Sequence, residues 1–94
     1  GELVLDLPSR GVQLAGSPVH LTTAEFELLL LLARHAGTTV TRDALSKQLR
    51  GIPWDGLDRS IDLRVSRLRR KLSDHEGHIL KSVRGVGYLL VPRV

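Results

Sequence analysis

The chain has 94 residues, 41% hydrophobic and 26% charged, a balance typical of one globular domain and not of a disordered or collagen-like chain. It contains no cysteine, which excludes disulfide bonds, thiol catalysis and cysteine-ligated zinc. The 14 basic residues exceed the 10 acidic ones and give a net charge of +4, which favours a polyanionic partner. We therefore expect a single domain over residues 1–94.

No segment predicts a membrane helix or a signal peptide. The longest apolar run, Leu28–Ala33, has six residues, whereas a membrane span needs roughly 20. The first residues also lack a cationic stretch followed by an apolar one. We expect a cytoplasmic protein that makes no membrane contact.

The first twenty-one residues predict a small antiparallel sheet. Glu2–Asp6 and Val12–Leu14 show period-2 alternation, and Val19–Leu21 is a third short strand. The proline and glycine residues within Pro8–Gly11 and Gly16–Pro18 predict the two connecting turns.

A capping box predicts the start of the first helix. Thr22 and Glu25 have the spacing at which each side chain accepts a hydrogen bond from the other's backbone amide. The helix is expected to end at about Gly37, since glycine readily adopts the left-handed conformation that ends helices. Its wide apolar stripe, which includes Phe26 and Leu28–Ala33, indicates a central element of the core.

Two further helices are expected, separated by an irregular loop. Thr41 is the predicted N-cap of a short helix that ends near Gly51. Residues 51–57 contain glycine, proline and the only tryptophan, and they predict the loop. Asp58 is the predicted N-cap of a helix that extends to about Leu72.

The C-terminal residues predict a β-hairpin. Ile79–Arg84 and Tyr88–Val91 are rich in residues that favour strands. The residues between them include Gly85 and Gly87, and glycine permits a tight turn.

The predicted third helix carries most of the positive charge. Residues 1–50 hold five basic and five acidic residues, whereas residues 51–94 hold nine basic and five acidic residues. Six of those nine cations lie between Arg59 and Lys71, with Asp62 as the one acid among them. A solvated helix face is the common explanation of such a run, so the charge alone leaves that alternative open.

The distribution of residues around this helix favours nucleic-acid binding. At 100° per residue, an apolar stripe of Ile61, Val65, Leu68 and Leu72 spans about 60°. The opposite side holds Arg59, Leu63, Ser66, Arg67 and Arg70. Arginine pairs bidentately with guanine or phosphate, and the order short helix, loop, basic helix, hairpin is that of a winged helix-turn-helix.

With these elements in order, the sequence resembles the DNA-binding effector domain of OmpR/PhoB-family two-component response regulators. The similarity extends from the N-terminal strands to Val91. It is carried by four segments at the family's spacing: Leu21–Leu29, Val40–Leu45, Asp58–Asp62 continuing into Leu68–Leu72, and Val83–Tyr88.

The resemblance implies an α+β winged helix-turn-helix fold. It consists of an N-terminal four-stranded antiparallel sheet, three helices and a C-terminal β-hairpin wing. The implied function is sequence-specific binding of double-stranded DNA by a bacterial transcription factor. The helix at about 58–72 would enter the major groove and the wing the minor groove, with two copies side by side on direct repeats.

The resemblance also implies a role for each matching position. Base contacts are expected from Arg59, Ser60, Asp62, Leu63 and Arg67. Phosphate contacts are expected from Arg42, Arg64, Arg69, Ser82 and Tyr88, and Arg70 is added because of its place on the exposed face. Arg84 would enter the minor groove.

One position departs from the family pattern. Many members carry tryptophan where this chain has Arg50, and we expect Arg50 to contact phosphate instead. The loop at 50–57 matches the segment through which family activators contact RNA polymerase. Trp54, further along this loop, either packs over the domain or contacts DNA or the polymerase.

The family's receiver domain is absent from this chain. A sensor kinase would therefore be a partner only through that missing domain, and none of the aspartates is its phosphorylation site. Because the receiver normally promotes dimers, we expect a monomer alone and a pair on DNA.

Other function classes are less favoured by the residues. An enzyme would need converging carboxylates, a Ser/His/Asp set or a phosphate-binding loop, and no such set is visible. The four histidines lack the i,i+4 spacing of helical metal ligands, so neither a metal nor a cofactor is expected. RNA recognition usually uses aromatic platforms, and this chain has one Phe, one Trp and one Tyr. A winged-helix protein-interaction module is the main alternative to DNA binding.

Overall fold

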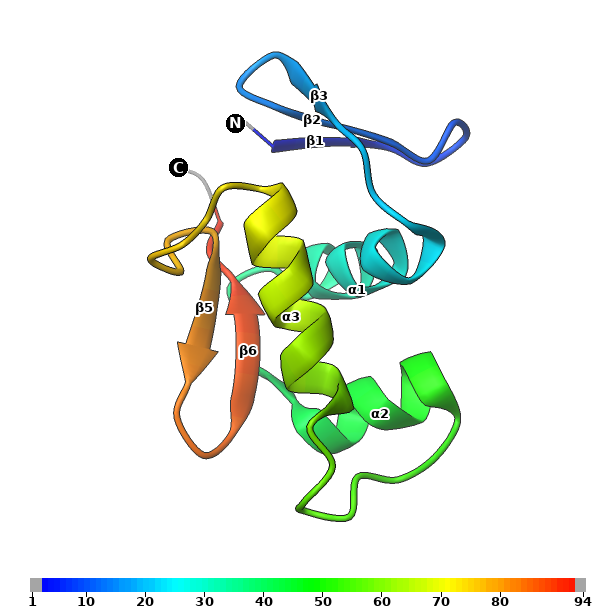
Figure 1. Ribbon diagram of the computed structural model, residues 1–94, viewed down its shortest axis with the longest axis vertical. Helices are drawn as coiled ribbons and strands as arrows, with labels where there is room; N and C mark the ends of the chain where they lie inside the picture. The colour runs from blue at the N-terminus through cyan, green and yellow to red at the C-terminus, as the bar shows by residue number, and fades with distance from the viewer. Residues whose placement is uncertain (1–2, 93–94) are drawn as a thin grey trace.

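The computed structural model describes residues 3–92, so Glu2, the first residue of the predicted first strand, lies outside the described residues. The elements in chain order are β1 (Leu3–Asp6), β2 (Gly11–Leu14), β3 (Ser17–Val19), α1 (Thr23–Arg34), β4 (Val40–Thr41), α2 (Arg42–Arg50), α3 (Ser60–Lys71), β5 (Leu80–Val83) and β6 (Gly87–Leu90). Figure 1 shows the β1–β3 sheet at one end of the molecule, α1 beneath it, and α2 at the other end.

The N-terminal sheet has three strands among the described residues, so the expectation of a four-stranded sheet was wrong. The strand that follows α1, β4, pairs with β6 instead, with Val40 opposite Tyr88 and Thr41 opposite Gly87. It therefore belongs to a second three-stranded sheet in the order β4-β6-β5. The reason is positional, because α1 carries the chain away from β1–β3 before β4 begins.

The third strand begins earlier than predicted, at Ser17 instead of Val19. Ala15 and Gly16 have φ values of 52° and 82° and form a two-residue hairpin turn, which requires positive φ at both positions. Pro18 then lies within β3, where its missing N–H is tolerated because β3 is at the edge of the sheet.

The predicted capping box starts α1. The Glu25 amide donates to Thr22 Oγ1 at 3.2 Å, and the Thr22 amide donates to Glu25 Oε1 at 2.8 Å. The helix ends at Arg34, three residues before Gly37, although Gly37 does adopt the predicted positive φ, 83°. The Gly37 amide donates to the Leu90 carbonyl at 2.9 Å and so ties the end of the turn to β6.

The second helix begins and ends as the sequence predicts, whereas the third begins later. Thr41 caps α2 by accepting from the Ala44 amide at 3.1 Å, and Gly51 ends it in the left-handed conformation. Helix α3 begins at Ser60 and ends at Lys71, inside the predicted range of about 58–72.

The core lies between α1, α2, α3 and the β4-β6-β5 sheet. Leu28, Leu29 and Leu32 of α1 are completely buried, as are Leu45 of α2 and Leu68 of α3. Burial of each such side chain stabilises the fold by about 1.5–3 kcal/mol. This packing holds α3 against the body of the domain and leaves its other side exposed.

An ion pair joins the start of α1 to the end of α3. Lys71 Nζ lies 3.1 Å from Glu25 Oε1 and 3.3 Å from the His20 carbonyl. Burial raises the pKa of the Glu25 carboxyl, but the bonds from Thr22 and Lys71 outweigh it and leave the pKa below its ordinary value. The carboxylate is therefore charged at neutral pH and fixes the C-terminal end of α3.

Candidate nucleic-acid interface

Three segments implicated by the sequence lie at the same end of the molecule. The N-terminus of α3, the turn between β5 and β6, and the loop between α2 and α3 all lie away from the β1–β3 sheet (Figure 1). This end combines a helix, a hairpin turn and a loop in one surface.

Helix α3 has the two faces that its sequence predicts. Ile61, Val65 and Leu68 on the inner face are at most 1% exposed. Arg67 and Leu63 on the outer face are exposed, and the Leu63 side chain retains 52% of its accessible surface. An exposed leucine among arginines suits a surface that meets both charged and apolar groups, such as a DNA groove.

The predicted DNA-contacting arginines fall into two groups. Within residues 3–92, four of them form neither an ion pair nor a side-chain hydrogen bond: Arg64, Arg67, Arg70 and Arg84. The others are paired or hydrogen-bonded within the domain, namely Arg42, Arg50, Arg59 and Arg69. The first group is available to an external anion without breaking an internal contact.

Asp62, predicted to contact a base, lies at the centre of an internal network. Its Oδ1 accepts from Arg42 Nε at 2.9 Å and from the Tyr88 hydroxyl. Arg59 Nε lies 3.6 Å from the other oxygen, Oδ2. The Arg42 guanidinium is also 5.1 Å from the centre of the Tyr88 ring, a cation–π distance. The structure thus brings together four predicted site residues, from α2, α3, β6 and the position directly before α3.

The network keeps Asp62 ionised. Burial raises the pKa of its carboxyl, but hydrogen bonds from Tyr88 and Arg42 outweigh burial and hold the pKa below its ordinary value. Burial and the Asp62 charge raise the pKa of the Tyr88 phenol. At neutral pH the phenol is therefore the donor and the carboxylate the acceptor, which fixes α2, α3 and the wing relative to one another.

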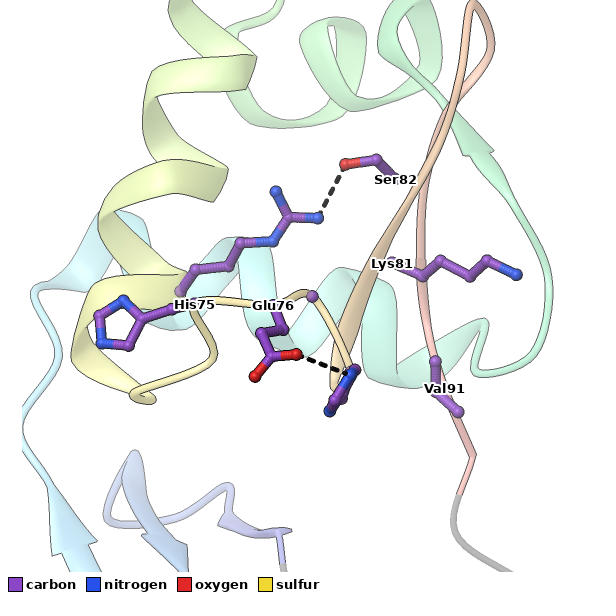
Figure 2. A pocket seen from close by; sticks show the side chains of 8 residues that line it. His75, Glu76, Lys81, Ser82 and Val91 are labelled. Carbon is purple, nitrogen blue, oxygen red and sulfur yellow. Dashed lines mark hydrogen bonds and ion pairs between the residues drawn. The ribbon is translucent and has the colours of Figure 1, made fainter.

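Arg69 and Ser82 form a second contact between α3 and the wing (Figure 2). Arg69 donates from Nε and Nη2 to the Leu80 carbonyl at 3.0 and 2.6 Å. Its Nη2 also donates to Ser82 Oγ at 2.8 Å, the bond that ends at the labelled Ser82 in Figure 2. These side chains border an open pocket of about 650 Å³ whose lining also includes His75, Glu76 and Lys81. Lys81 was not predicted as a site residue, because the residues next to it in the chain do not indicate that the pocket exists.

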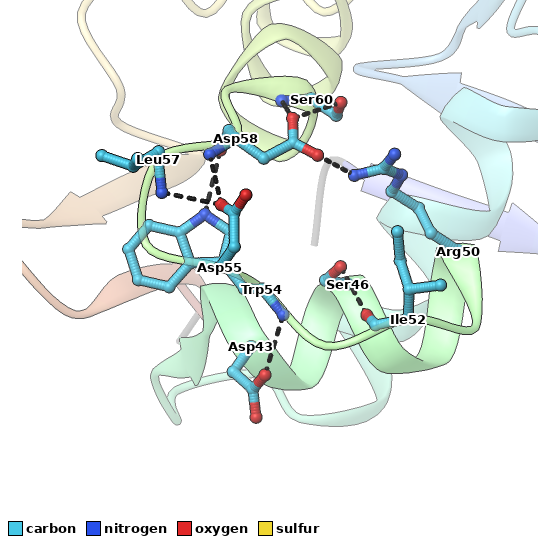
Figure 3. Close-up of polar contacts among 9 residues, drawn as sticks. All are labelled: Asp43, Ser46, Arg50, Ile52, Trp54, Asp55, Leu57, Asp58 and Ser60. Carbon is cyan, nitrogen blue, oxygen red and sulfur yellow. Dashed lines mark hydrogen bonds and ion pairs between the residues drawn. The ribbon is translucent and has the colours of Figure 1, made fainter.

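Arg50 points back toward the start of α3 (Figure 3). Its guanidinium forms an ion pair with Asp58, and the Asp58 carboxylate also accepts from the Ser60 amide and hydroxyl. These bonds, from Ser60 first and then Arg50, lower the pKa of Asp58 to about 2. The predicted contact between Arg50 and phosphate stays a prediction.

Trp54 is half-buried within the loop between α2 and α3. Its amide donates to Asp43 Oδ1 at 3.0 Å, and its indole Nε1 donates to the Asp58 carbonyl at 2.9 Å (Figure 3). These two bonds hold Trp54 within the domain, and a contact of Trp54 with DNA or the polymerase stays a prediction. These partners were missed in the sequence, although aspartates before turns and helix starts are a usual sign of such bonds.

Neither a metal cluster nor a membrane helix is found in the part of the chain that the structure describes. Residues 3–92 contain no group of three His, Cys, Asp or Glu side chains suited to a metal ion. No helix over the same residues is long and apolar enough to cross a membrane.

The fold and the exposed arginines define the class as a winged helix-turn-helix domain with a basic recognition surface. Residues 16–90 match the family described as "Transcriptional regulatory protein, C terminal". The chain is 52% identical over 94 residues to the transcriptional regulatory protein RstA of Escherichia coli K12, covering 98% of this chain and 39% of RstA. The chain therefore belongs to this family of C-terminal regulatory domains, and its relatives are OmpR/PhoB-type response regulators.

Solved structures show the same fold. The DNA-binding domain of Klebsiella pneumoniae RstA, in complex with the RstA box, is 48% identical, with a TM-score of 0.95 and coverage of 99% of this chain and 94% of that one. The Thermotoga maritima response regulator DrrB, an OmpR/PhoB homologue, is 34% identical with a TM-score of 0.86, covering 98% of this chain and 42% of DrrB. The chain spans about two fifths of the length of the curated relatives it matches.

Proposed function

We propose that this domain binds double-stranded DNA sequence-specifically, as the effector domain of a bacterial two-component response regulator in the cytoplasm. The observation that carries the proposal is the outer face of α3 and its edge, where Arg67, Arg70 and the half-buried Arg64 form no ion pair within residues 3–92. The K. pneumoniae RstA domain, solved on its DNA box, supports it through a nearly identical backbone.

In the proposed complex, α3 lies in the major groove. Arg59, Ser60, Asp62, Leu63 and Arg67 would face bases. The phosphates would be contacted directly by a second set of side chains, or by neighbours that these side chains position: Arg42, Arg64, Arg69, Arg70, Ser82 and Tyr88. Arg84, exposed in the wing turn, would enter a minor groove narrowed by A·T pairs, where the negative potential is enhanced.

We further propose two protein contacts. A second copy would bind beside the first on a direct repeat, since one domain covers too little DNA for specificity in a genome. RNA polymerase would contact the loop at 50–57, whose Leu57 and Ile52 side chains are 83% and 45% exposed. A sensor kinase would act only through a receiver domain on a longer protein.

Selection from random duplex DNA, followed by a salt titration of the selected site, tests the function. If about five to seven phosphates are neutralised, log K should fall with log salt at a slope of roughly −5 to −6. An affinity independent of salt, or equal binding to an acidic protein, would contradict DNA binding. The second result would favour the alternative, a winged-helix protein-interaction module that uses the exposed apolar loop.

A further inference from the structure

The loop between α2 and α3 is closed at both ends by a single ion pair. Arg50 is the last residue of α2, and Asp58 lies two residues before the start of α3. Their side chains are 27% and 31% exposed, so the pair is half-buried against the domain. A charged pair in this position fixes the distance between the two helices of the helix-turn-helix.

The two oxygens of Asp58 serve different partners. Oδ2 accepts from Arg50, while Oδ1 accepts from the Ser60 amide at 2.8 Å and the Ser60 hydroxyl at 2.6 Å. Arg59, the residue directly before α3, makes no capping bond of its own. Asp58 therefore holds the first turn of α3, and Arg50 holds Asp58.

The rest of the loop is built around the same residue. Asp55 Oδ1 accepts from the amides of Leu57 and Asp58, each at 2.8 Å. The Trp54 indole donates to the Asp58 carbonyl at 2.9 Å (Figure 3). Asp58 is thus fixed through its backbone and through both carboxylate oxygens.

Electrostatics explains why Arg50 stays with Asp58. A DNA backbone beside α3 repels an unpaired carboxylate, and the neighbouring guanidinium cancels that charge. If Arg50 turned to a phosphate, it would leave Asp58 uncompensated at the start of α3, facing the DNA.

We propose that Arg50 is a positioning residue for DNA binding, which acts through Asp58 to order the first turn of α3, and is not a phosphate ligand. This inference rests on the proposed function. It assigns Arg50 a role different from that of the tryptophan that many family members carry at this position.

The test compares Arg50→Met, Asp58→Asn and the double variant on the duplex selected by the wild-type domain and on a random duplex of equal length. Asparagine keeps an acceptor for Ser60 but removes the charge that holds Arg50. We expect each single variant to lose affinity for the selected duplex, roughly tenfold for each residue that must be ordered again on binding. The double variant should lose no more than either single one, and the salt slope should not change.

A phosphate ligand gives the opposite pattern. Arg50→Met would then weaken both duplexes equally and reduce the magnitude of the salt slope by about 0.9. Asp58→Asn would bind as well as the wild type or better, because it removes a negative charge and frees Arg50. Either result would overturn the proposal.

Two controls keep the outcome specific. Arg34→Met removes the same charge from the exposed end of α1, and it is expected to leave the preference for the selected duplex intact. If Arg50→Met does not fold, the isosteric Asp58→Asn variant decides the question by the direction of its effect. Failure of the wild-type domain to prefer any duplex would refute the proposed function itself, before any variant is compared.

Discussion

Arg64 and Arg67 are close in sequence but differ in exposure on α3, and this difference predicts different roles. Arg67 is exposed on the outer face, whereas Arg64 is half-buried at its edge. A fully exposed side chain can reach base edges, while one nearer the core-facing side of the helix meets the backbone of the DNA.

We expect Arg67→Ala to cost about 1–3 kcal/mol of binding free energy on the selected site and to relax base preference at one position. Arg64→Ala should weaken binding to all sequences alike. Competition binding against single-base variants of the site measures both effects. A uniform loss from both substitutions would show that Arg67 contacts only phosphate.

Asp62 has a pKa held below its ordinary value, and this makes its contribution to stability dependent on pH. A carboxyl with a lowered pKa in the folded state stabilises the fold above its unfolded pKa, about 4. That contribution is lost as the pH falls through the folded value. We expect Asp62→Asn to lower the free energy of unfolding by about 1–2 kcal/mol near pH 7, since Arg42 and Tyr88 would then donate to a neutral amide instead of a carboxylate.

The difference between Asp62→Asn and the wild type should shrink as the pH falls from about 4 toward 2. Urea unfolding at a series of pH values measures it. The exposed carboxyl of Asp6, in the N-terminal sheet, offers a control, and Asp6→Asn should have a small effect. A difference for Asp62→Asn that does not depend on pH would contradict the charged network.

At the scale of elements, the wing depends on a close approach between β6 and β4. A Cβ atom added at Gly87 would lie 2.0 Å from the Val40 carbonyl oxygen and 2.9 Å from Thr41 Cα. Both neighbours are backbone atoms, so the two strands would have to separate. Gly85, in the wing turn, has a positive φ of 75° but open space around it.

We therefore expect Gly87→Ala to destabilise the domain by about 1–3 kcal/mol or more, as overpacking does. Gly85→Ala should cost less, about 1–2 kcal/mol, because only the left-handed conformation is penalised. Thermal unfolding of the two variants compares them directly. An equal or smaller loss at Gly87 would mean that β4 and β6 are not in close contact.

At the scale of the whole molecule, the proposed direct repeat sets the spacing of two domains on DNA. The two α3 helices can enter the same side of the duplex only if their sites lie about one helical turn apart, roughly 10–11 base pairs. An insertion of about five base pairs places the second site on the opposite side of the duplex.

We expect such an insertion to abolish cooperative binding while each single site keeps its affinity. Electrophoretic mobility shifts on the original and the extended repeat, with a single-site duplex as control, measure both quantities. Unchanged cooperativity would remove the tandem arrangement but not DNA binding by one domain.

The sequence alone determined those features that depend on local chemistry. The capping box at Thr22, the N-cap at Thr41 and the apolar stripe of α3 follow from side chains a few residues apart, and the structure shows each of them. The hairpin and the order of the helices were predicted in the same way. These features require only the period of a helix or the preference of a residue for a turn.

The tertiary structure alone decided the contacts between distant residues. β4 pairs with β6 and not with the N-terminal sheet. The sequence did not predict this partner, because a two-residue strand carries too little alternating pattern to specify one. Asp62 meets Arg42 and Tyr88, which are 20 and 26 residues away in the chain. This packing also decided which arginines remain free for DNA. An arginine that folding places beside a carboxylate forms an ion pair with it, and the others stay unpaired.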